Sequence, residues 1–395
     1  MEDTEMTALQ KKLDELSATV NRQHAEHFGW LNQMLQQQNN MLSSQVGSLR
    51  QEQQSLKRAL GITDANMPFE PYYNRSVEMS SREPELYNKY GERMQPIFLS
   101  DRNGAHDPYA FMPRYIFFDR YDYALKNHMY TGDEAFRTVG KPINKFAQPG
   151  ENRAIHPHIY EHYLQNRSYF ENEFQYVFTH DDEILNTFSN ARLILSYAGL
   201  YWYGNQQPKM GNNKIDEHRG GGEILSAENY KNKTKNISII ASNKRMCRMH
   251  LVRQEFAKKC KAEHLADTFG RFDGGPYVPI EVPFQHYRFS IAIENFQSRY
   301  YFTEKITNCF AAQTIPIYLG ATEIDKFYNP DGIITLKESD FDHLGDFLKQ
   351  CTPEEYERRL PAVIDNYNRL FRYADANYGM DLLYKQYIRP VIEAQ

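Results

Sequence analysis

Two stretches within the first sixty residues share a heptad-like pattern of apolar positions. Apolar side chains recur in alternating steps of three and four between residues 6 and 20, and again between residues 42 and 60 after a change of phase. Such a repeat is typical of a coiled coil. The alternative is a single helix lying along its own domain, but a lone polar helix of this length is poorly stable in water. We therefore expect residues 1–61 to form a coiled-coil helix that joins copies of the chain into a homo-oligomer.

Short apolar runs then alternate with amphipathic stretches up to about residue 225. The segment from residue 156 to 171 has helical spacing, and a glycine-rich segment at 211–223 predicts a flexible connector. This alternation predicts a parallel sheet built from βαβ units, and we assign residues 68–225 to an N-terminal lobe. The apolar runs predict strands at residues 95–100, 114–119, 144–148, 174–180 and 191–199.

A second alternating region follows the connector. Its apolar runs predict strands at residues 235–242, 287–294 and 314–320, and helices are expected at 243–260 and 304–313. We assign residues 226–375 to a C-terminal lobe and residues 376–395 to a final amphipathic helix. Two lobes of this kind imply a ligand cleft between them.

The composition narrows the class of protein. The chain has 395 residues and a formal net charge of −5, so no general attraction to nucleic acid is expected. It has no apolar stretch of the roughly 20 residues that a membrane helix needs, and its polar N-terminus differs from a signal peptide. The four cysteines form no C-x-x-C pair, so no zinc site is indicated. We expect a cytoplasmic protein, either fully soluble or peripheral at the inner face of a membrane.

Polar side chains gather on the crossover between the predicted strands at 287–294 and 314–320. Ligands of open parallel sheets bind at the carboxyl ends of the strands. Lys305 and the start of the following helix suit a phosphate, Glu304 can accept hydrogen bonds from sugar hydroxyls, and Tyr301 can stack on a ligand. These features predict a nucleotide-diphosphate site. The alternative is an ordinary solvated helix start, because a single Glu-Lys pair is common.

The amino-acid sequence of this crossover resembles that of one known family. The sequence FSIAIEN, followed by YFTEK and then by A-x-T-I-P-I-Y-L-G, resembles the signature of glycosyltransferase family 10, the α-1,3/4-fucosyltransferases and their bacterial relatives. The resemblance implies a GT-B fold of two Rossmann-like lobes. It also implies that the GDP part of GDP-fucose is held by Asn295, Tyr301, Glu304 and Lys305, with Glu294 as a possible further contact.

A basic stretch after the strand at 235–242 adds a cation to this set. The resemblance places an arginine near the pyrophosphate, at the start of the next helix. The spacing favours Arg248, with Arg245 as the alternate. A fixed guanidinium there would neutralise the charge that develops on the departing GDP. The alternative is that the basic cluster is only a solvated helix face.

The N-terminal lobe carries the candidate base. The turn PGEN resembles a glutamate-containing turn of the bacterial family members, which implies that Glu151 is the general base. His180 and Asp181, which follow the strand at 174–180, are further candidates for the wall of the cleft. No D-x-D motif stands where a metal-dependent sugar transferase needs one, so no metal and no other cofactor are expected.

The resemblance therefore implies an inverting glycosyltransferase. Its substrates would be GDP-fucose as donor and a hydroxyl of an oligosaccharide or surface-glycan precursor as acceptor. Two alternatives stay open at this point. The donor could be another GDP-sugar, such as a heptose or another deoxysugar, or the chain could be a coiled-coil scaffold whose transferase-like domain is inactive.

Overall fold

Two β-sheets organise the chain. The structure is a computed structural model that describes residues 84–101, 114–194, 226–373 and 376–394, apart from single positions 89 and 141. One sheet is formed before residue 194 and the other after residue 234, and nearly all their strand pairs are parallel. The chain is therefore a mixed α/β protein. The predicted coiled coil and the predicted glycine-rich connector lie outside the described residues and stay predictions.

The first sheet has seven strands in the order β1-β2-β4-β5-β6-β7, with β3 also paired to β2. All its pairs are parallel except the β1–β2 hairpin. The sequence pattern predicts β2, β3, β5, β6 and β7 but misses β1 and β4. The strands are β1 (Leu86–Tyr87), β2 (Arg93–Ser100), β3 (Ile116–Asp119), β4 (Asn127–Thr131), β5 (Asn144–Gln148), β6 (Tyr176–Thr179) and β7 (Ala191–Leu193).

Strand β4 escapes prediction because its buried side chains are largely polar. Asn127 accepts a hydrogen bond of 2.7 Å from the amide of Asn144 on the neighbouring strand. The ring of His128 lies 2.8 Å from the Tyr130 hydroxyl and 2.7 Å from the Leu125 carbonyl oxygen. Since these polar groups satisfy one another, the strand is buried without an apolar run to mark it.

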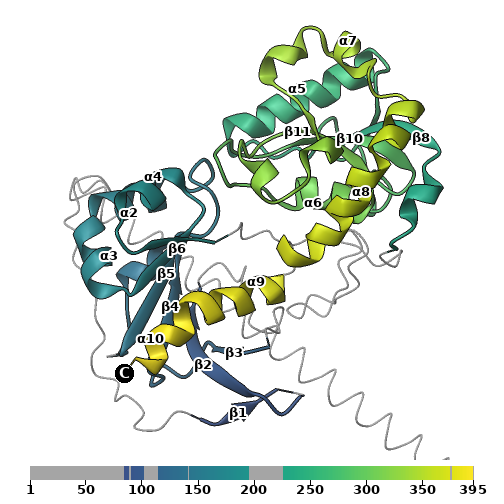
Figure 1. The fold of residues 1–395 in the computed structure, drawn as a ribbon. Coiled ribbons are helices and arrows are strands. Elements are labelled where there is room, and N and C mark those ends of the chain that lie inside the picture. The colour runs from purple at the N-terminus through teal and green to yellow at the C-terminus, as the bar shows by residue number, and fades with distance from the viewer. Residues whose placement is uncertain are drawn as a thin grey trace, which may run out of the picture. The chain divides into compact units, whose positions relative to one another are not determined.

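The two faces of this sheet are covered by different parts of the chain. Alternate side chains of a strand point to opposite faces. On one face, Ile97, Leu99 and Phe146 pack with Leu383 and Ile388 from the C-terminal helices, and Figure 1 shows α9 and α10 lying across the strands. The final helical segment therefore completes the core of the first sheet. The helical elements of this part are η1 (Gly132–Phe136), α2 (Pro157–Gln165), α3 (Arg167–Glu173), α4 (Asp182–Thr187), α9 (Ala376–Leu383), a π-helical turn (Tyr384–Ile388) and α10 (Arg389–Glu393).

The second sheet has five strands in the order β12-β11-β10-β8-β9, and every pair is parallel. Its strands are β8 (Lys235–Ile240), β9 (Asp267–Phe269), β10 (Tyr287–Ile293), β11 (Ile315–Leu319) and β12 (Ile334–Thr335). Its helices are α5 (Arg248–Ala262), α6 (Glu304–Ala311), α7 (Leu344–Leu348) and α8 (Pro353–Tyr373). Short 3-10 turns join them: η2 (Asn229–Asn232), η3 (Ile324–Lys326), η4 (Pro330–Gly332) and η5 (Glu338–Phe341).

Helices α5 and α6 pack into two separate cores of this sheet. From α5, Phe256 and Cys260 pack against the strands together with Tyr356 of α8. From α6, Ile306 and Phe310 are buried in the second core. The β10-α6-β11 crossover is thus a βαβ unit whose polar loop leaves the carboxyl end of β10. Helix α5 begins five residues later than the sequence pattern predicts.

Two findings concern the whole of the described chain. None of the described helices combines the length and the apolar character that crossing a membrane requires. All four cysteines carry free thiols, and Cys260, Cys309 and Cys351 are buried. The thiols therefore contribute as small apolar side chains to the packing of the second sheet.

Candidate functional site

Glu294, directly after β10, anchors the polar loop. Its side chain is fully buried, and its carboxylate accepts hydrogen bonds from the backbone N–H (2.8 Å) and the hydroxyl (2.7 Å) of Thr303. Gly320 lies against it, since a Cβ there would come within 2.6 Å of Glu294 Cγ and 2.3 Å of the Tyr318 hydroxyl oxygen. Because Thr303 is the N-cap of α6, Glu294 fixes both the exit of the strand and the entry of the helix.

Lys305 lies in a cage of oxygen atoms at the start of α6. Its ammonium is 2.9 Å from Thr303 Oγ1, 2.9 Å from Glu304 Oε1 and 3.6 Å from Glu294 Oε2. Only 15% of the Lys305 side chain is exposed. The structure therefore brings the predicted residues Glu294, Glu304 and Lys305 together, with the lysine charge already shared between two carboxylates.

The pKa values of the two carboxyls respond differently to this setting. Burial raises the pKa of Glu294, and the neighbouring Lys305 ammonium opposes that rise. Burial also acts to raise the pKa of Glu304, but the charge and hydrogen bond of Lys305, the hydrogen bond of Thr303 and the charge of Arg253 together hold it below its ordinary value. Glu304 is therefore the carboxyl that carries the negative charge most firmly.

The structure places a different arginine near this cluster from the one that the sequence favours. Arg253, on the second turn of α5, is 8% exposed, and its guanidinium Nη2 donates a hydrogen bond of 2.6 Å to Asn295 Oδ1. The sequence does hold a signal for it. Met249, Arg253 and Phe256 fall on the buried stripe of α5, where an arginine is out of place unless it has a polar partner.

Arg248 and Arg245, the arginines predicted from spacing, lie on the surface. The Arg248 side chain is 68% exposed and forms a bidentate ion pair with Glu338, at 2.6 and 2.7 Å. Arg245 is also exposed. The start of α5 at Arg248, rather than near residue 243, turns both side chains away from the buried face that carries Arg253. A contact of either arginine with the pyrophosphate stays a prediction. For Arg248 it would require the side chain to release Glu338 and bind the pyrophosphate instead.

Glu151 follows β5 at the carboxyl end of the first sheet, on an exposed turn that Gly150 enters with a φ of +92°. Its Oε1 accepts a hydrogen bond of 3.0 Å from the Tyr301 hydroxyl, and its backbone oxygen accepts one of 2.6 Å from the Tyr160 hydroxyl. Burial, followed by the charge of Glu151, raises the pKa of Tyr301 well above its usual value, so the phenol is a proton donor in this pair. Thus Glu151 and Tyr301 are in direct contact.

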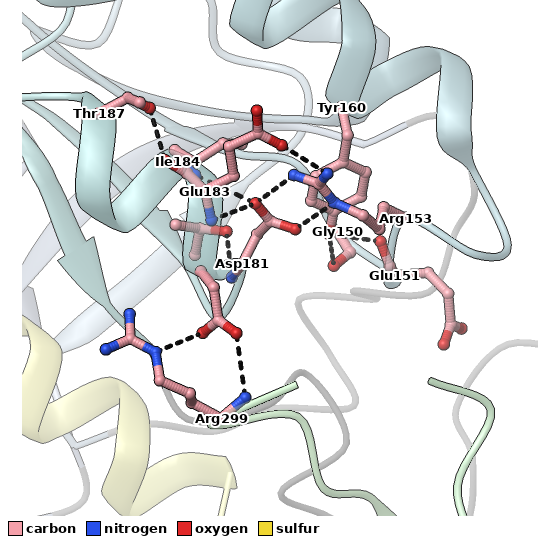
Figure 2. Close-up of polar contacts among 11 residues, drawn as sticks. Gly150, Glu151, Arg153, Tyr160, Asp181, Glu183, Ile184, Thr187 and Arg299 are labelled. Atoms are coloured by element: carbon pink, nitrogen blue, oxygen red, sulfur yellow. Dashed lines mark hydrogen bonds and ion pairs between the residues drawn. The ribbon is translucent and has the colours of Figure 1, made fainter. Parts of the chain in front are cut away.

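Asp181 and His180 occupy the end of β6. The Asp181 carboxylate accepts two hydrogen bonds of 2.6 Å from Arg153 and caps α4 by accepting from the backbone of Glu183 and Ile184, as Figure 2 shows. These partners make Asp181 a structural anchor of the turn. The figure also shows that the Glu151 side chain extends away from this network.

His180 differs from Asp181 in that one of its ring nitrogens, Nε2, forms no hydrogen bond with any residue that the structure describes. Its ring is buried, and the ring centroid lies 5.1 Å from that of Tyr301. Burial lowers the pKa of His180 to about 4, which keeps the imidazole neutral near pH 7. The imidazole therefore packs beside Tyr301, and its role in lining a ligand cleft stays a prediction.

A second contact to the polar loop was not predicted. The backbone N–H and Nε of Arg299 each donate a hydrogen bond of 3.1 Å to the Asp182 carboxylate, and Figure 2 draws these two bonds from the labelled Arg299. The Nη2 of Arg299 also donates to Asn186 Oδ1 at 3.2 Å. Arg299 lies on the loop that carries Tyr301, and Asp182 begins α4. Among the residues that the structure describes, no group of three or more His, Cys, Asp or Glu side chains could hold a metal ion.

Comparison with known protein families gives a match over the second sheet and most of its helices. Residues 230–360 match the model for the C-terminal part of glycosyltransferase family 10 (fucosyltransferase). A stretch of 64 residues is 36% identical to the alpha-(1,3)-fucosyltransferase FucT of Helicobacter pylori, and covers 16% of this chain and 13% of that protein. A stretch of 76 residues is 33% identical to an alpha-(1,4)-fucosyltransferase of Arabidopsis thaliana, and covers 19% of this chain and 18% of that protein.

Two solved structures that are similar to this chain are also described as fucosyltransferases. A crystal structure of an alpha1,3-fucosyltransferase is 16% identical, covers 80% of this chain and 93% of its own, and has a TM-score of 0.44. A structure described as the alpha1,3-fucosyltransferase with GDP is 18% identical, covers 81% and 94% of the two chains, and has a TM-score of 0.45. The matched residues 230–360 include the YFTEK motif on which the resemblance rests. Residues 230–360 of this chain are therefore similar to the C-terminal part of glycosyltransferase family 10.

Proposed function

We propose that this chain is an inverting glycosyltransferase that moves fucose from GDP-fucose to a hydroxyl of an oligosaccharide or surface-glycan acceptor. We further propose that its two parallel sheets are the two Rossmann-like lobes of a GT-B fold. The single observation that carries the proposal is the hydrogen bond between Tyr301 and Glu151. It joins the motif that the family resemblance assigns to the donor with the carboxylate that it assigns to catalysis.

The donor side of the proposal rests on the start of α6. Asn295, Tyr301, Glu304 and Lys305 would hold the GDP moiety, with the diphosphate near Lys305 and the sugar hydroxyls of the nucleotide near Glu304. Free N–H groups at a helix start and a fixed ammonium both favour an anion. The Lys305 charge is available only in part, because Glu294 and Glu304 already share it.

The acceptor side rests on Glu151. An exposed carboxylate can reach a hydroxyl of a large acceptor, and the hydrogen bond from Tyr301 fixes the orientation of its Oε1. As the acceptor oxygen attacks the anomeric carbon, Glu151 would take up the hydroxyl proton while the bond to GDP breaks on the opposite face. Cations at α6 would stabilise the charge that builds on GDP. The residues are compatible with a reaction that uses no metal.

Two measurements test the proposal. Incubation with GDP-fucose and an array of oligosaccharide acceptors, followed by mass spectrometry, should detect a fucosylated product. GDP should also raise the melting temperature of the protein, because a ligand that binds only the folded state stabilises it. Transfer from a different GDP-sugar but not from GDP-fucose would refute the donor assignment. Neither stabilisation by GDP nor transfer would favour the scaffold alternative.

A further inference from the structure

We propose that Asp182, the first residue of α4, is a positioning residue for the general base. Its carboxylate holds Arg299 of the polar loop between β10 and α6. This contact fixes where the Tyr301 hydroxyl meets the Glu151 carboxylate. The inference rests on the proposed function, because Glu151 is the proposed base and Tyr301 is a proposed donor contact. Neither Asp182 nor Arg299 is among the residues from which the site was predicted.

Three hydrogen bonds join Arg299 to α4. The two oxygens of the Asp182 carboxylate each accept one bond of 3.1 Å, from the backbone N–H and from Nε of Arg299, and Asn186 accepts the third from Nη2 at 3.2 Å. The Arg299 and Asp182 side chains are 36% and 33% exposed, and an ion pair that is open to water contributes little to stability. Bonds to both the backbone and the guanidinium do, however, define where this part of the loop lies. We therefore assign the contact to positioning rather than to stability.

One tight turn connects Arg299 to Tyr301. The backbone N–H of Tyr301 donates a hydrogen bond of 3.2 Å to Ser298 Oγ, which closes the turn around Arg299 and Tyr300. The Arg299 guanidinium also lies 4.9 Å from the centre of the Tyr300 ring. The Tyr301 side chain is only 1% exposed, so close packing leaves its ring little freedom to move independently of the backbone. A shift of Arg299 therefore moves the hydroxyl that donates to Glu151.

The start of α4 also holds the turn that carries the base. Asp181, the neighbour of Asp182, accepts two hydrogen bonds of 2.6 Å from Arg153, which lies two residues after Glu151 (Figure 2). Two adjacent carboxylates thus bind two arginines, Arg153 from the turn of the base and Arg299 from the polar loop. The hydrogen bond between the base and the polar loop then closes a ring of contacts. Within that ring, the helix start sets the distance between the two groups that meet.

Other contacts of the polar loop do not involve α4. The backbone N–H of Thr322 donates a hydrogen bond of 2.9 Å to the Ser298 carbonyl oxygen, and that of Glu323 donates one of 3.1 Å to the Arg299 carbonyl oxygen. Both donors follow β11 in the second sheet, where the proposed GDP contacts also lie. Loss of the Asp182 carboxylate would therefore leave the loop attached to the second sheet and free it from α4. The inference predicts a loss of transfer without a loss of GDP affinity.

The test removes the carboxylate and compares transfer with binding on the full chain. A displacement of about 1 Å can lower a rate about a hundredfold. We therefore expect Asp182→Ala to lower single-turnover transfer from GDP-fucose about ten- to hundredfold, while the dissociation constant for GDP, measured by calorimetry, stays within about twofold. Asp182→Asn keeps one acceptor oxygen and should recover part of the loss. Arg299→Ala keeps the backbone bond to Asp182 and should lose only about three- to tenfold.

A matched control and a double variant separate positioning from a general loosening of the protein. Asp346→Ala also removes an aspartate from the first turn of a helix, where it pairs with Lys349 on the surface, and should change neither transfer nor binding. If Asp182 acts through the base, Asp182→Ala should lower transfer by no more than about twofold once Glu151→Gln has removed the base. Independent effects would multiply instead, and the double variant would lose a further ten- to hundredfold, on the order of the single effect.

The outcomes distinguish this inference from the proposed function. If the unaltered chain transfers no sugar from GDP-fucose, both fail. Only the inference is overturned if the unaltered chain is active and Asp182→Ala transfers within about threefold of it, if GDP affinity falls as much as transfer, or if the effects of Asp182→Ala and Glu151→Gln multiply. Should Asp182→Ala not unfold cooperatively, Arg299→Ala carries the test. A loss of transfer of about threefold or more at unchanged GDP affinity then supports the inference, and a smaller loss overturns it.

Discussion

Replacing Glu151 by glutamine exchanges one carboxylate oxygen for an NH₂ group and tests the proposed general base directly. The substitution removes the charge and the basicity of the side chain, but it keeps a carbonyl oxygen where Oε1 now accepts the hydrogen bond of 3.0 Å from Tyr301. Because Glu151 lies on an exposed turn, the free energy of unfolding should change by no more than about 0.5 kcal/mol. Any large effect on turnover would therefore come from the chemistry.

The expected size of the effect follows from the role. A general base contributes about 10²- to 10⁴-fold to the rate, which corresponds to about 3 to 5.5 kcal/mol of activation free energy. Tyr301, the partner of Glu151, is also expected to contact the donor, so the retained hydrogen bond should keep its position. The dissociation constant for GDP should thus stay within about twofold of the unaltered value.

The assay is single-turnover transfer from GDP-fucose to an acceptor, combined with calorimetric titration of GDP. Glu161→Gln is a matched control. Glu161 is an exposed residue of α2, and its substitution removes the same charge from the same part of the chain. It should leave transfer unchanged. A fall in GDP affinity that parallels the fall in turnover, or a rate loss below about tenfold, would show that Glu151 is not the base.

Three further predictions concern the second sheet and the N-terminal segment. Lys305→Met should raise the dissociation constant for GDP at least about tenfold. It should also lower the free energy of unfolding in urea by about 3 to 5 kcal/mol. The loss should be larger at pH 8 than at pH 5, because burial raises the pKa of Glu294 and the buried carboxyl group costs less when it is protonated. Equal losses at both pH values would contradict this reasoning. Tyr328→Phe removes a buried hydroxyl that forms no hydrogen bond within the described part of the chain, so the melting temperature should stay the same or rise, and a fall would refute it. Deletion of residues 1–60 should reduce the number of chains per particle, measured by light scattering, without abolishing transfer, and an unchanged number of chains would exclude oligomerisation through this segment.

Periodicity predicts the strands of this protein where burial is apolar. Strands β2, β5, β8, β10 and β11 all follow apolar runs, and the structure confirms them within two residues at each end. The same reasoning misses β4 because Asn127, His128 and Tyr130 are buried through hydrogen bonds with their neighbours. A pattern of polarity along the chain cannot show which polar side chains will find partners across a sheet.

The contribution of the C-terminal helices lies beyond any local pattern. An amphipathic tail is predicted from its spacing, but the surface that its apolar side should cover is not. Leu383 and Ile388 pack against Ile97 and Leu99, nearly three hundred residues earlier in the chain. The backbone N–H of Tyr115 donates a hydrogen bond to Asp381 at 3.1 Å, which fixes the same contact. Only the three-dimensional structure reveals that the first sheet depends on the last residues of the chain.

The arginines show most clearly what the sequence could and could not specify at the site. Spacing from the strand at 235–242 favours Arg248, which the structure pairs with Glu338 on the surface. The stripe of buried residues on α5 instead selects Arg253. When Met249 and Phe256 define the buried face of the helix, Arg253 is a charged residue in an otherwise apolar row. The motif indicates a resemblance to the family, but the phase of the helix decides which guanidinium lies near the cluster.

The charges of the cluster are also relevant to the proposed donor site. Glu294 is needed to close the β10–α6 loop, and its burial requires a nearby cation. Lys305 alone would meet that need, and Glu304 would then leave the site with one excess negative charge. The buried Arg253 balances this second carboxylate. A cluster arranged only for stability would gain little from adding both Glu304 and Arg253, because each buried charge costs solvation free energy. Their joint presence is expected where Glu304 must face sugar hydroxyls while Lys305 faces an anion.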